Sequence, residues 1–378
     1  MKTRGRSSSR KTVPKVGAVA EDPQMAARAA GLHYVTDRLP GITRKRKGSN
    51  FTYYDAEGKR LLDPSELKRI RSLVIPPAWE RVWICPRTNG HLQATGFDDR
   101  GRKQYKYHST WRTVRDEAKF ERLLSFAESL PRIRVRVDED MRRPELGREK
   151  VLGTVVRLLE VSLIRIGNEE YVKENKSFGL TTMRNRHVKV EGSSARFQFR
   201  GKSGKRHVIE VSDERAAKII RKCQDLPGQQ LFEYLSPAGE VVPIASEDVN
   251  DYLQKISGQA FTAKDFRTWA GTVLAAIALG KMEEVDSQAA AKRNVVMAIE
   301  AVARLLGNTV AICRKCYIHP AVTASYLDGA LARTLRRKAD SQITKRLHYL
   351  KPEEAVVLAL LRQELAQRAN GEAERLKA

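Results

Sequence analysis

Cysteine is scarce in this sequence, with four residues in a chain of 378, at positions 85, 223, 313 and 316. Four scattered cysteines are too few for a disulfide framework in so long a chain, which indicates free thiols in a reducing compartment. Cys313 and Cys316 have C-x-x-C spacing, but no second pair of cysteines or histidines completes a tetrahedral zinc site. We therefore expect the thiols to pack in a core, and we expect no metal and no cofactor.

Long apolar runs are also missing. No stretch of about 18 apolar residues, the length that spans a bilayer, occurs in the sequence, and neither does the pattern of a secretory signal peptide. We therefore expect a cytoplasmic protein that does not associate with a membrane. The sequence likewise contains no Gly-x-x-x-x-Gly-Lys-Ser/Thr loop, no Gly-x-Gly-x-x-Gly, and no paired carboxylates or histidine cluster typical of a two-metal nuclease.

Acidic residues are too few to balance the basic ones. There are 70 Lys and Arg against 45 Asp and Glu, a formal net charge of +25. Such an excess favours an anionic partner. We expect that partner to be nucleic acid. The hydrophobic content of 41% is enough for real cores, and the length predicts two domains plus tails.

The amino-terminal part of the chain changes character at about residue 31. Residues 1–30 combine basic residues with serines and contain no acid before Glu21, which predicts a disordered basic arm. Residues 31–109 contain short strand-like runs, such as 51–54 and 82–85, separated by turn residues, with one short helix near 65–72. We interpret this part as a small β-rich domain that binds DNA.

The last run of this domain, Gly101–His108, alternates tyrosines with cations. In a strand, the tyrosines would share one face and the cations the other. One interpretation is a nucleic-acid contact, with bases or sugars on Tyr105 and Tyr107 and phosphates on cations such as Lys103. The alternative is a half-buried edge strand with a solvated basic face, and the composition alone favours neither.

From residue 110 the periodicity is mostly helical, and we expect one domain over 110–350. One predicted helix covers 121–130, where Pro131 should end it, and a longer one covers 147–166. Three alternating runs, 187–191, 196–200 and 206–211, are separated by glycine-rich turns and predict a three-stranded antiparallel meander. Residues 351–378 should form a C-terminal amphipathic helix that begins at Pro352. The predicted fold class is therefore α+β.

A tyrosine among cations is the centre of the candidate site. Gly307 is well placed to end a helix in a left-handed conformation, and Tyr317 follows it. A phenol has an ordinary pKa of about 10 and needs partners that stabilise its charge before it can act as a nucleophile. The candidates for the whole site are Tyr317, Arg165, Lys202, Arg267 and Asn308.

Each cation among these candidates also has a simpler explanation. Arg165 falls in the last turn of a predicted helix, where a cation favours the helix dipole. Lys202 falls at the tip of a hairpin, where a solvated lysine is common. Arg267 falls in the first turn of a helix, where a cation opposes the dipole, and a residue placed against its local preference is a better functional candidate.

Taken together, the five residue types suit phosphoryl transfer. Two guanidiniums offer forked donors to a phosphate, and a lysine with a lowered pKa can protonate the leaving oxygen. The set implies an attack by tyrosine on a phosphodiester without metal or ATP. Because one phosphodiester replaces another, the step is nearly isoenergetic and can run backwards to reseal the strand.

Several motifs, in order, resemble the type IB DNA topoisomerases of the compact poxvirus and bacterial kind over about residues 31–350. They are Arg165-Ile166-Gly167-Asn168, Glu170-Tyr171, Phe178-Gly179-Leu180-Thr181-Thr182, Phe199-Arg200-Gly201-Lys202-Ser203-Gly204-Lys205, Lys264-Asp265-Phe266-Arg267-Thr268-Trp269, and Gly307-Asn308-Thr309 with Tyr317. The resemblance implies a C-shaped clamp, in which a small β domain and a mostly helical catalytic domain close round duplex DNA. It also implies a monomer that relaxes supercoils by cleavage of one strand, rotation and religation.

The resemblance assigns a role to each candidate. Gly101–His108 resembles the DNA-contacting strand of the family's amino-terminal domain, which makes Lys103, Gln104, Tyr105 and Tyr107 the expected DNA contacts. Tyr317 would form a 3′-phosphotyrosyl bond and release a 5′-hydroxyl strand. Arg165 and Arg267 would bind the scissile phosphate, and Lys202 would be the general acid toward the 5′ oxygen. Asn308 stands where the viral and eukaryotic enzymes have a histidine; asparagine can donate a neutral hydrogen bond to a phosphate oxygen but cannot carry a proton.

Two other functions fit parts of the sequence. Tyrosine site-specific recombinases use a similar Arg, Lys, Arg, Tyr set, but they usually have His-x-x-Arg at the second arginine, where this chain has Lys264-Asp265-Phe266-Arg267. A non-catalytic nucleoid-type DNA-binding protein would account for the net charge alone. It predicts salt-sensitive binding, no covalent adduct, and no effect of Tyr317→Phe.

Overall fold

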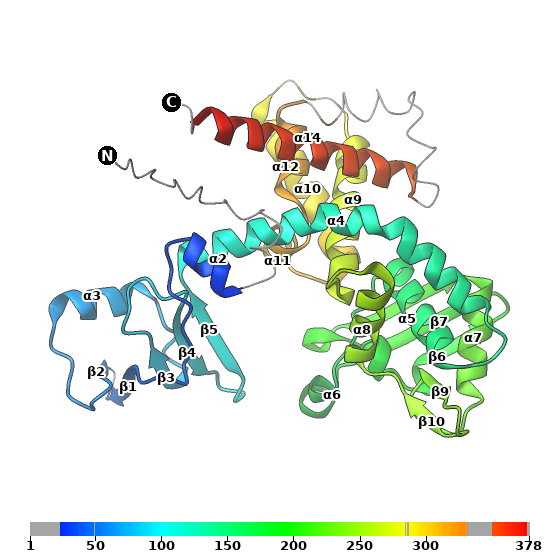
Figure 1. Ribbon diagram of the computed structural model, residues 1–378, viewed down its shortest axis with the longest axis horizontal. Coiled ribbons are helices and arrows are strands. Elements are labelled where there is room, and N and C mark those ends of the chain that lie inside the picture. Colours follow the sequence, from blue (N-terminus) through cyan, green and yellow to red (C-terminus); the bar gives the residue numbers. More distant parts are fainter. Residues whose placement is uncertain are drawn as a thin grey trace, which may run out of the picture. The chain divides into compact units, whose positions relative to one another are not determined.

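The computed structural model describes residues 23–375 with gaps at 49, 284, 286, 330 and 332–349. The chain divides into two units, Met1–Glu121 and Arg122–Ala378, and both are mixtures of helices and antiparallel sheets (Figure 1). The mixed α and β composition agrees with the predicted class.

The first unit contains a five-stranded antiparallel sheet with strand order β2-β1-β3-β4-β5. Its strands are β1 (Ile42–Lys47), β2 (Asn50–Tyr54), β3 (Glu80–Ile84), β4 (Leu92–Phe97) and β5 (Lys103–Tyr107). Helix α3 (Pro64–Ser72) begins at Asp63, whose carboxylate accepts a hydrogen bond from the Ser65 amide. One cluster of buried apolar side chains in this unit comes from β1, β3, β4 and α3, namely Ile42, Ile70, Val82, Ile84 and Ala94.

Helix α2 (Pro23–Ala29) corrects the prediction of a disordered arm over residues 1–30. Residues 1–22 of that arm lie outside the described residues. Ala26 and Ala27 of α2 are buried in a cluster with Leu32 and Trp111. The chain is therefore ordered from Pro23, because these small apolar side chains pack against a tryptophan and offset the entropy cost of ordering the segment.

Helix α4 (Ser109–Arg142) contradicts the prediction that Pro131 ends a helix. The proline lies inside the helix, and apolar residues stay buried on both sides of it, from Phe126 and Leu130 to Ile133 and Val137. A proline within a helix costs about 3 kcal/mol through the lost hydrogen bond and a steric clash. Burial of several apolar side chains, each worth about 1.5–3 kcal/mol, outweighs that cost.

The second unit contains the predicted meander, whose strand order is β6-β7-β8. Strands β6 (Val188–Glu191), β7 (Ser194–Arg200) and β8 (Arg206–Ser212) pair antiparallel, and β7 and β8 are joined by the short turn η3 (Lys202–Gly204). A second small sheet, β9 (Glu233–Leu235) with β10 (Val241–Pro243), was not predicted. Its three-residue strands are too short to produce an alternating pattern.

Helices form the rest of the second unit, and α9 lies among several of them. They are α5 (Arg148–Ser162), α6 (Glu169–Asn175), α7 (Glu214–Gln224), α8 (Ser246–Ser257), α9 (Ala263–Gly280), α10 (Gln288–Leu306), α11 (Val310–Cys316), α12 (Pro320–Leu327) and α14 (Pro352–Arg375), with short turns η1 (Leu180–Thr182) and η2 (Asn185–His187). Helix α9 contacts α5, α8, α10, α12 and α14. Such a position explains why most of its residues are buried and makes it the rigid support of the site described below.

Helix α14 is fixed to this core through a buried carboxylate. Glu354 accepts two hydrogen bonds from Arg134, each of 2.8 Å, and one of 3.1 Å from the indole nitrogen of Trp269. These bonds, together with the Arg134 charge, lower the pKa of Glu354 although its burial acts in the opposite direction. Among the described helices, no single one is long and apolar enough to cross a bilayer, and one bent pair, α10 with α11, meets the length and composition test.

Candidate active site

Arg165 lies on an extended segment just after α5, not in its last turn as predicted. The helix ends at Ser162 because Leu163 takes a left-handed conformation with φ of 57°. The segment then runs against the residues before η1, where the Leu180 amide donates to the Arg165 carbonyl at 2.9 Å. A Cβ on Gly179 would lie 2.4 Å from the amide nitrogen of Gly167. The two glycines in these motifs thus allow the backbones to touch, and this contact fixes the position of Arg165.

Arg267 is the fifth residue of α9, just past the first turn in which it was predicted, and it is almost completely buried, with 4% of its surface exposed. One of its terminal nitrogens donates to the Leu163 carbonyl and the other donates to the Leu306 carbonyl at 2.6 Å. These carbonyls lie at the C-terminal ends of α5 and α10, where the helix dipoles are negative. The negative ends of α5 and α10 therefore offset the unfavourable interaction of Arg267 with the positive end of the α9 dipole.

Asn308 follows the left-handed Gly307, which ends α10 with φ of 61° as predicted. Its side-chain oxygen accepts a hydrogen bond of 2.6 Å from a terminal nitrogen of Arg165. Its amide nitrogen is buried and has no hydrogen-bond partner among the described residues. The asparagine thus orients one of the two arginines and keeps one donor free.

Tyr317 ends α11, and its backbone is held against α9. The hydroxyl of Thr272 donates to the Tyr317 carbonyl at 3.4 Å, and a Cβ on Gly271 would lie 2.5 Å from the same oxygen. The phenol ring is half-buried, and the guanidinium carbon of Arg267 lies 5.4 Å from its centre. A tyrosine ring on a fixed backbone thus lies beside a buried cation.

Lys202 opens the η3 turn between β7 and β8, at the tip of the predicted hairpin, and its side chain is exposed. It lines a small cavity of about 20 Å³ together with Arg165 and Arg267. Residues more than a hundred positions apart in the sequence therefore meet around one space, which is about large enough for a single water molecule. The structure brings all five predicted site residues into this region.

The electrostatics of this cluster indicate an anion as its ligand. Burial lowers the pKa of both Arg165 and Arg267, and Arg165 lowers that of Arg267 further, whereas the Tyr317 hydroxyl acts in the opposite direction on each. A buried cation beside a half-buried one is costly unless negative charge compensates them. The Nε of Arg267 is also buried without a partner in the described part of the chain. Together with the free Asn308 amide, it offers donors that a phosphate oxygen can use.

His207 is a further residue of this cavity, and the sequence reasoning did not single it out. Strand β8 places it directly opposite Phe199 of β7, and the two rings stack 5.2 Å apart with an angle of 19° between their planes. Alternation along β8 puts His207 on the same face as the less exposed Ile209 and Val211. This pattern marks the side chain as inward-facing but does not link it to the site.

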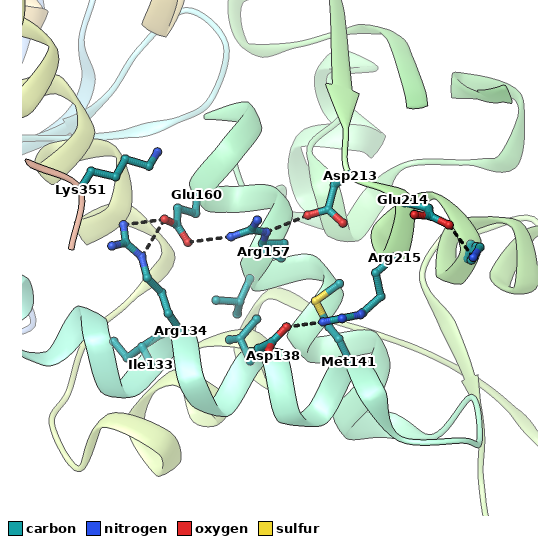
Figure 2. Close-up of a pocket in the computed structure, with 13 residues that line it drawn as sticks. Ile133, Arg134, Asp138, Met141, Arg157, Glu160, Asp213, Glu214, Arg215 and Lys351 are labelled. Atoms are coloured by element: carbon teal, nitrogen blue, oxygen red, sulfur yellow. Dashed lines mark hydrogen bonds and ion pairs between the residues drawn. The ribbon is translucent and has the colours of Figure 1, made fainter. Parts of the chain in front are cut away.

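A second, much larger cavity of this unit is lined by paired charges. It measures about 750 Å³ and is lined by residues of α4, α5 and α7, and Figure 2 shows its basic side chains meeting acidic ones. Arg134 lies 2.6 Å from Glu160, and Arg157 lies 2.9 Å from Asp213. Because these cations are already neutralised, this cavity is less suited to an anion than the cavity that Arg165, Lys202 and Arg267 line.

The predicted DNA contacts of the first unit lie on β5. Lys103, Tyr105 and Tyr107 are exposed, and the tyrosine rings stack 6.0 Å apart. The expectation that all cations take the opposite face is wrong for Lys103, because residues 103, 105 and 107 share one side of a strand. Lys103 pairs with Asp37 at 2.5 Å, and Gln104 donates to Asp98 at 3.0 Å.

Metal ligands are not grouped in the described part of the chain: no cluster of three His, Cys, Asp or Glu side chains is placed to hold an ion. Cys85, Cys223 and Cys313 are buried free cysteines. Burial raises the pKa of each of these thiols, to about 11 for Cys313. They are packing residues, as expected.

Comparison with known proteins gives matches along most of the chain. Residues 108–345 match the model of the eukaryotic DNA topoisomerase I catalytic core, and residues 50–98 match that of the bacterial DNA topoisomerase IB N-terminal domain. DNA topoisomerase 1B of Acanthamoeba polyphaga mimivirus is 30% identical over 287 residues, which cover 74% of this chain and 85% of that protein. DNA topoisomerase 1B of Vaccinia virus (strain Copenhagen) is 22% identical over 64% of this chain and 73% of that protein. DNA topoisomerase 1 of Schizosaccharomyces pombe is 27% identical over 44% of this chain and 20% of that protein.

Proposed function

Because this chain belongs to the type IB DNA topoisomerase family, as its motifs predicted, we propose that it relaxes supercoiled duplex DNA through a covalent tyrosine intermediate. The observation that carries the proposal is the shared cavity. The buried Arg267, the half-buried Arg165 and a hairpin lysine line it. The nucleophile candidate lies beside Arg267, and two buried donor atoms have no partner in the described chain.

In the proposed cleavage step, the Tyr317 hydroxyl oxygen attacks the phosphorus of one strand. The new bond joins that oxygen to the 3′ phosphate, the bond from phosphorus to the 5′ oxygen breaks, and the phenol proton passes to water. Lys202 donates a proton to the leaving oxygen, and its exposed turn position allows it to reach the DNA. Religation reverses each of these transfers, so the cycle needs no ATP.

The arginines stabilise the charge that builds on the non-bridging oxygens. Preorganised donors of this kind are typically worth a factor of about 10²–10³ each in rate. Arg165 is held by Asn308 and Arg267 by two helix ends, so neither must reorganise when the charge develops. The free amide of Asn308 donates a neutral hydrogen bond to the same phosphate, in the place of the family histidine.

In the second part of the proposal, the first unit binds the DNA duplex. Lys103, Gln104, Tyr105 and Tyr107 contact the duplex away from the cleaved bond, and the two units close round the DNA as a C-shaped clamp. The enzyme acts as a cytoplasmic monomer on nucleoid DNA. The positive charge of the chain supports this part of the proposal, because phosphate neutralisation provides most of the sequence-independent affinity for DNA.

The test is relaxation of negatively supercoiled plasmid in EDTA without ATP, with Tyr317→Phe as the test variant. Tyr326→Phe is the matched control, since its hydroxyl accepts a hydrogen bond from Asn294 and plays no part in the proposed chemistry. We expect the wild type and the control to relax the plasmid and Tyr317→Phe to leave it supercoiled. Equal linking numbers with and without the wild-type protein would mean DNA binding only, and a requirement for paired recombination sites would mean a recombinase.

A further inference from the structure

The imidazole of His207 lies between the two turns that carry Lys202 and Asn308. On one side, a Cβ on Gly201 would lie 2.7 Å from the ring carbon Cδ2 and 2.8 Å from Nε2. Gly201 has φ of −96°, a value that any residue can adopt, so the glycine is needed here for space and not for its conformation. The backbone just before Lys202 therefore rests on the imidazole.

The other edge of the ring meets the turn before Asn308. A Cβ on Gly307 would lie 2.9 Å from the ring carbon Cε1 of His207. Since real Cβ atoms do not approach so closely, the turn at Gly307 also rests on this ring. One side chain of β8 thus sets the distance between the hairpin turn and the end of α10.

The surroundings of the ring keep it neutral. Burial lowers the pKa of His207, and the charges of Arg165, Arg267 and Lys205 lower it further, while Lys202 lines the same cavity. No hydrogen bond holds the imidazole within the described chain, and its aromatic contact is the stack on Phe199. The ring therefore acts through its shape, as a flat spacer that adds no third positive charge to the two arginines.

We propose that His207 is a positioning residue, which holds the Lys202 turn against the Asn308 turn so that both side chains reach the same phosphate. The inference rests on the proposed function for the identity of that phosphate. A misplacement of about 1 Å between catalytic groups can slow a reaction about 10²-fold. Removing the spacer should therefore affect the chemical step much more than DNA binding.

The test is single-turnover cleavage of a nicked duplex from which the cut strand diffuses away. We expect His207→Ala to slow formation of the covalent adduct about 10- to 100-fold with noncovalent affinity changed less than about threefold. His207→Phe, which keeps a ring on Phe199, should recover to within about threefold of the wild type. Val208→Ala is the control, because Val208 is the next residue of β8 and is 57% exposed.

A double-mutant cycle with Gly201→Ala separates positioning from loss of stability. Alone, Gly201→Ala should slow cleavage at least about tenfold, because the added methyl group displaces the His207 ring. In the His207→Ala background the methyl group has room, so Gly201→Ala should reduce the cleavage rate little further. The proposal would be overturned if the effects of the two substitutions on the cleavage rate were fully additive. It would also be overturned if His207→Ala cleaved at the wild-type rate, or if His207→Phe cleaved as slowly as His207→Ala. Absence of any adduct with the wild-type protein would overturn the proposed function and this inference together.

Discussion

Replacing Asn308 by aspartate exchanges an amide for a carboxylate of the same shape, and we predict that the variant is more stable but much less active. Asn308 holds Arg165 through its side-chain oxygen, and its amide nitrogen is a buried donor without a partner in the described chain. Aspartate would keep the first contact as an ion pair and would remove the second donor. It would also place a negative charge where the phosphate must bind.

The size of each effect follows from the geometry. No carboxylate in the described residues pairs with Arg165, and opposite charges about 4 Å apart interact by about 4 kcal/mol at an effective dielectric constant of about 20. Desolvation of the new carboxylate consumes part of this energy, so we expect a net gain of about 1–2 kcal/mol in the free energy of unfolding without DNA. Neutralising one guanidinium and losing one donor should slow cleavage by at least about 10³.

The assays are urea unfolding of the free protein and single-turnover cleavage of the nicked duplex, with Asn308→Ala as the comparison. In the Asn308→Asp protein, Arg165 should hold the pKa of the introduced carboxyl below the ordinary aspartate value of about 3.9. The added stability is therefore fully present above that ordinary value and is lost as the pH falls through the lowered one. An Asn308→Asp protein that is less stable than the wild type at pH 7, or that cleaves at a similar rate, would refute the reasoning.

Three further predictions follow from single contacts. Lys202→Ala should slow cleavage at least about 10²-fold with little change in DNA affinity, and a large loss of affinity would make the lysine a phosphate contact only. Because the pKa of His207 lies below its ordinary value of 6.5 in the folded state, the unfolded chain binds more protons below that pH. Stability should therefore fall on acidification from pH 7, and it should fall less in His207→Phe when measured by thermal unfolding. Glu354→Gln should lower the free energy of unfolding by about 1.5–3 kcal/mol, since Arg134 loses one charged partner and keeps its ion pair with Glu160. The exposed Glu353→Gln, the control, should change it by less than about 0.5 kcal/mol.

The site could be predicted from the sequence because its residues sit at places with strong local patterns. Gly307 ends a periodic helix, and the glycine-rich turn at Lys202 joins two alternating strands; both features have the predicted geometry. Local patterns also predicted the meander and strands β2, β3 and β5, but not β1 or β4. Local patterns identified the candidate site residues. The order of the motifs suggested their catalytic roles, which are proposals.

The missed features depend on contacts between distant segments. Pro131 lies inside α4 because buried apolar residues continue beyond it. Arg165 lies outside the predicted helix because α5 ends before the left-handed Leu163. The Leu163 carbonyl accepts a hydrogen bond from Arg267, which lies 104 residues later in the chain. His207 belongs to the site through its approach to Gly307, a contact that no pattern within one strand can reveal.

The central claim is that Tyr317 becomes covalently joined to the 3′ end of a cut DNA strand, and peptide mapping of the trapped adduct tests it most directly. Wild-type protein would be incubated with the nicked duplex in EDTA, digested with protease, and the DNA-linked peptide identified by mass spectrometry. The account predicts a phosphodiester between Tyr317 and the 3′ phosphate, together with a released strand that carries a 5′ hydroxyl. An adduct on another residue, a link to the 5′ end, or no adduct at all would contradict it.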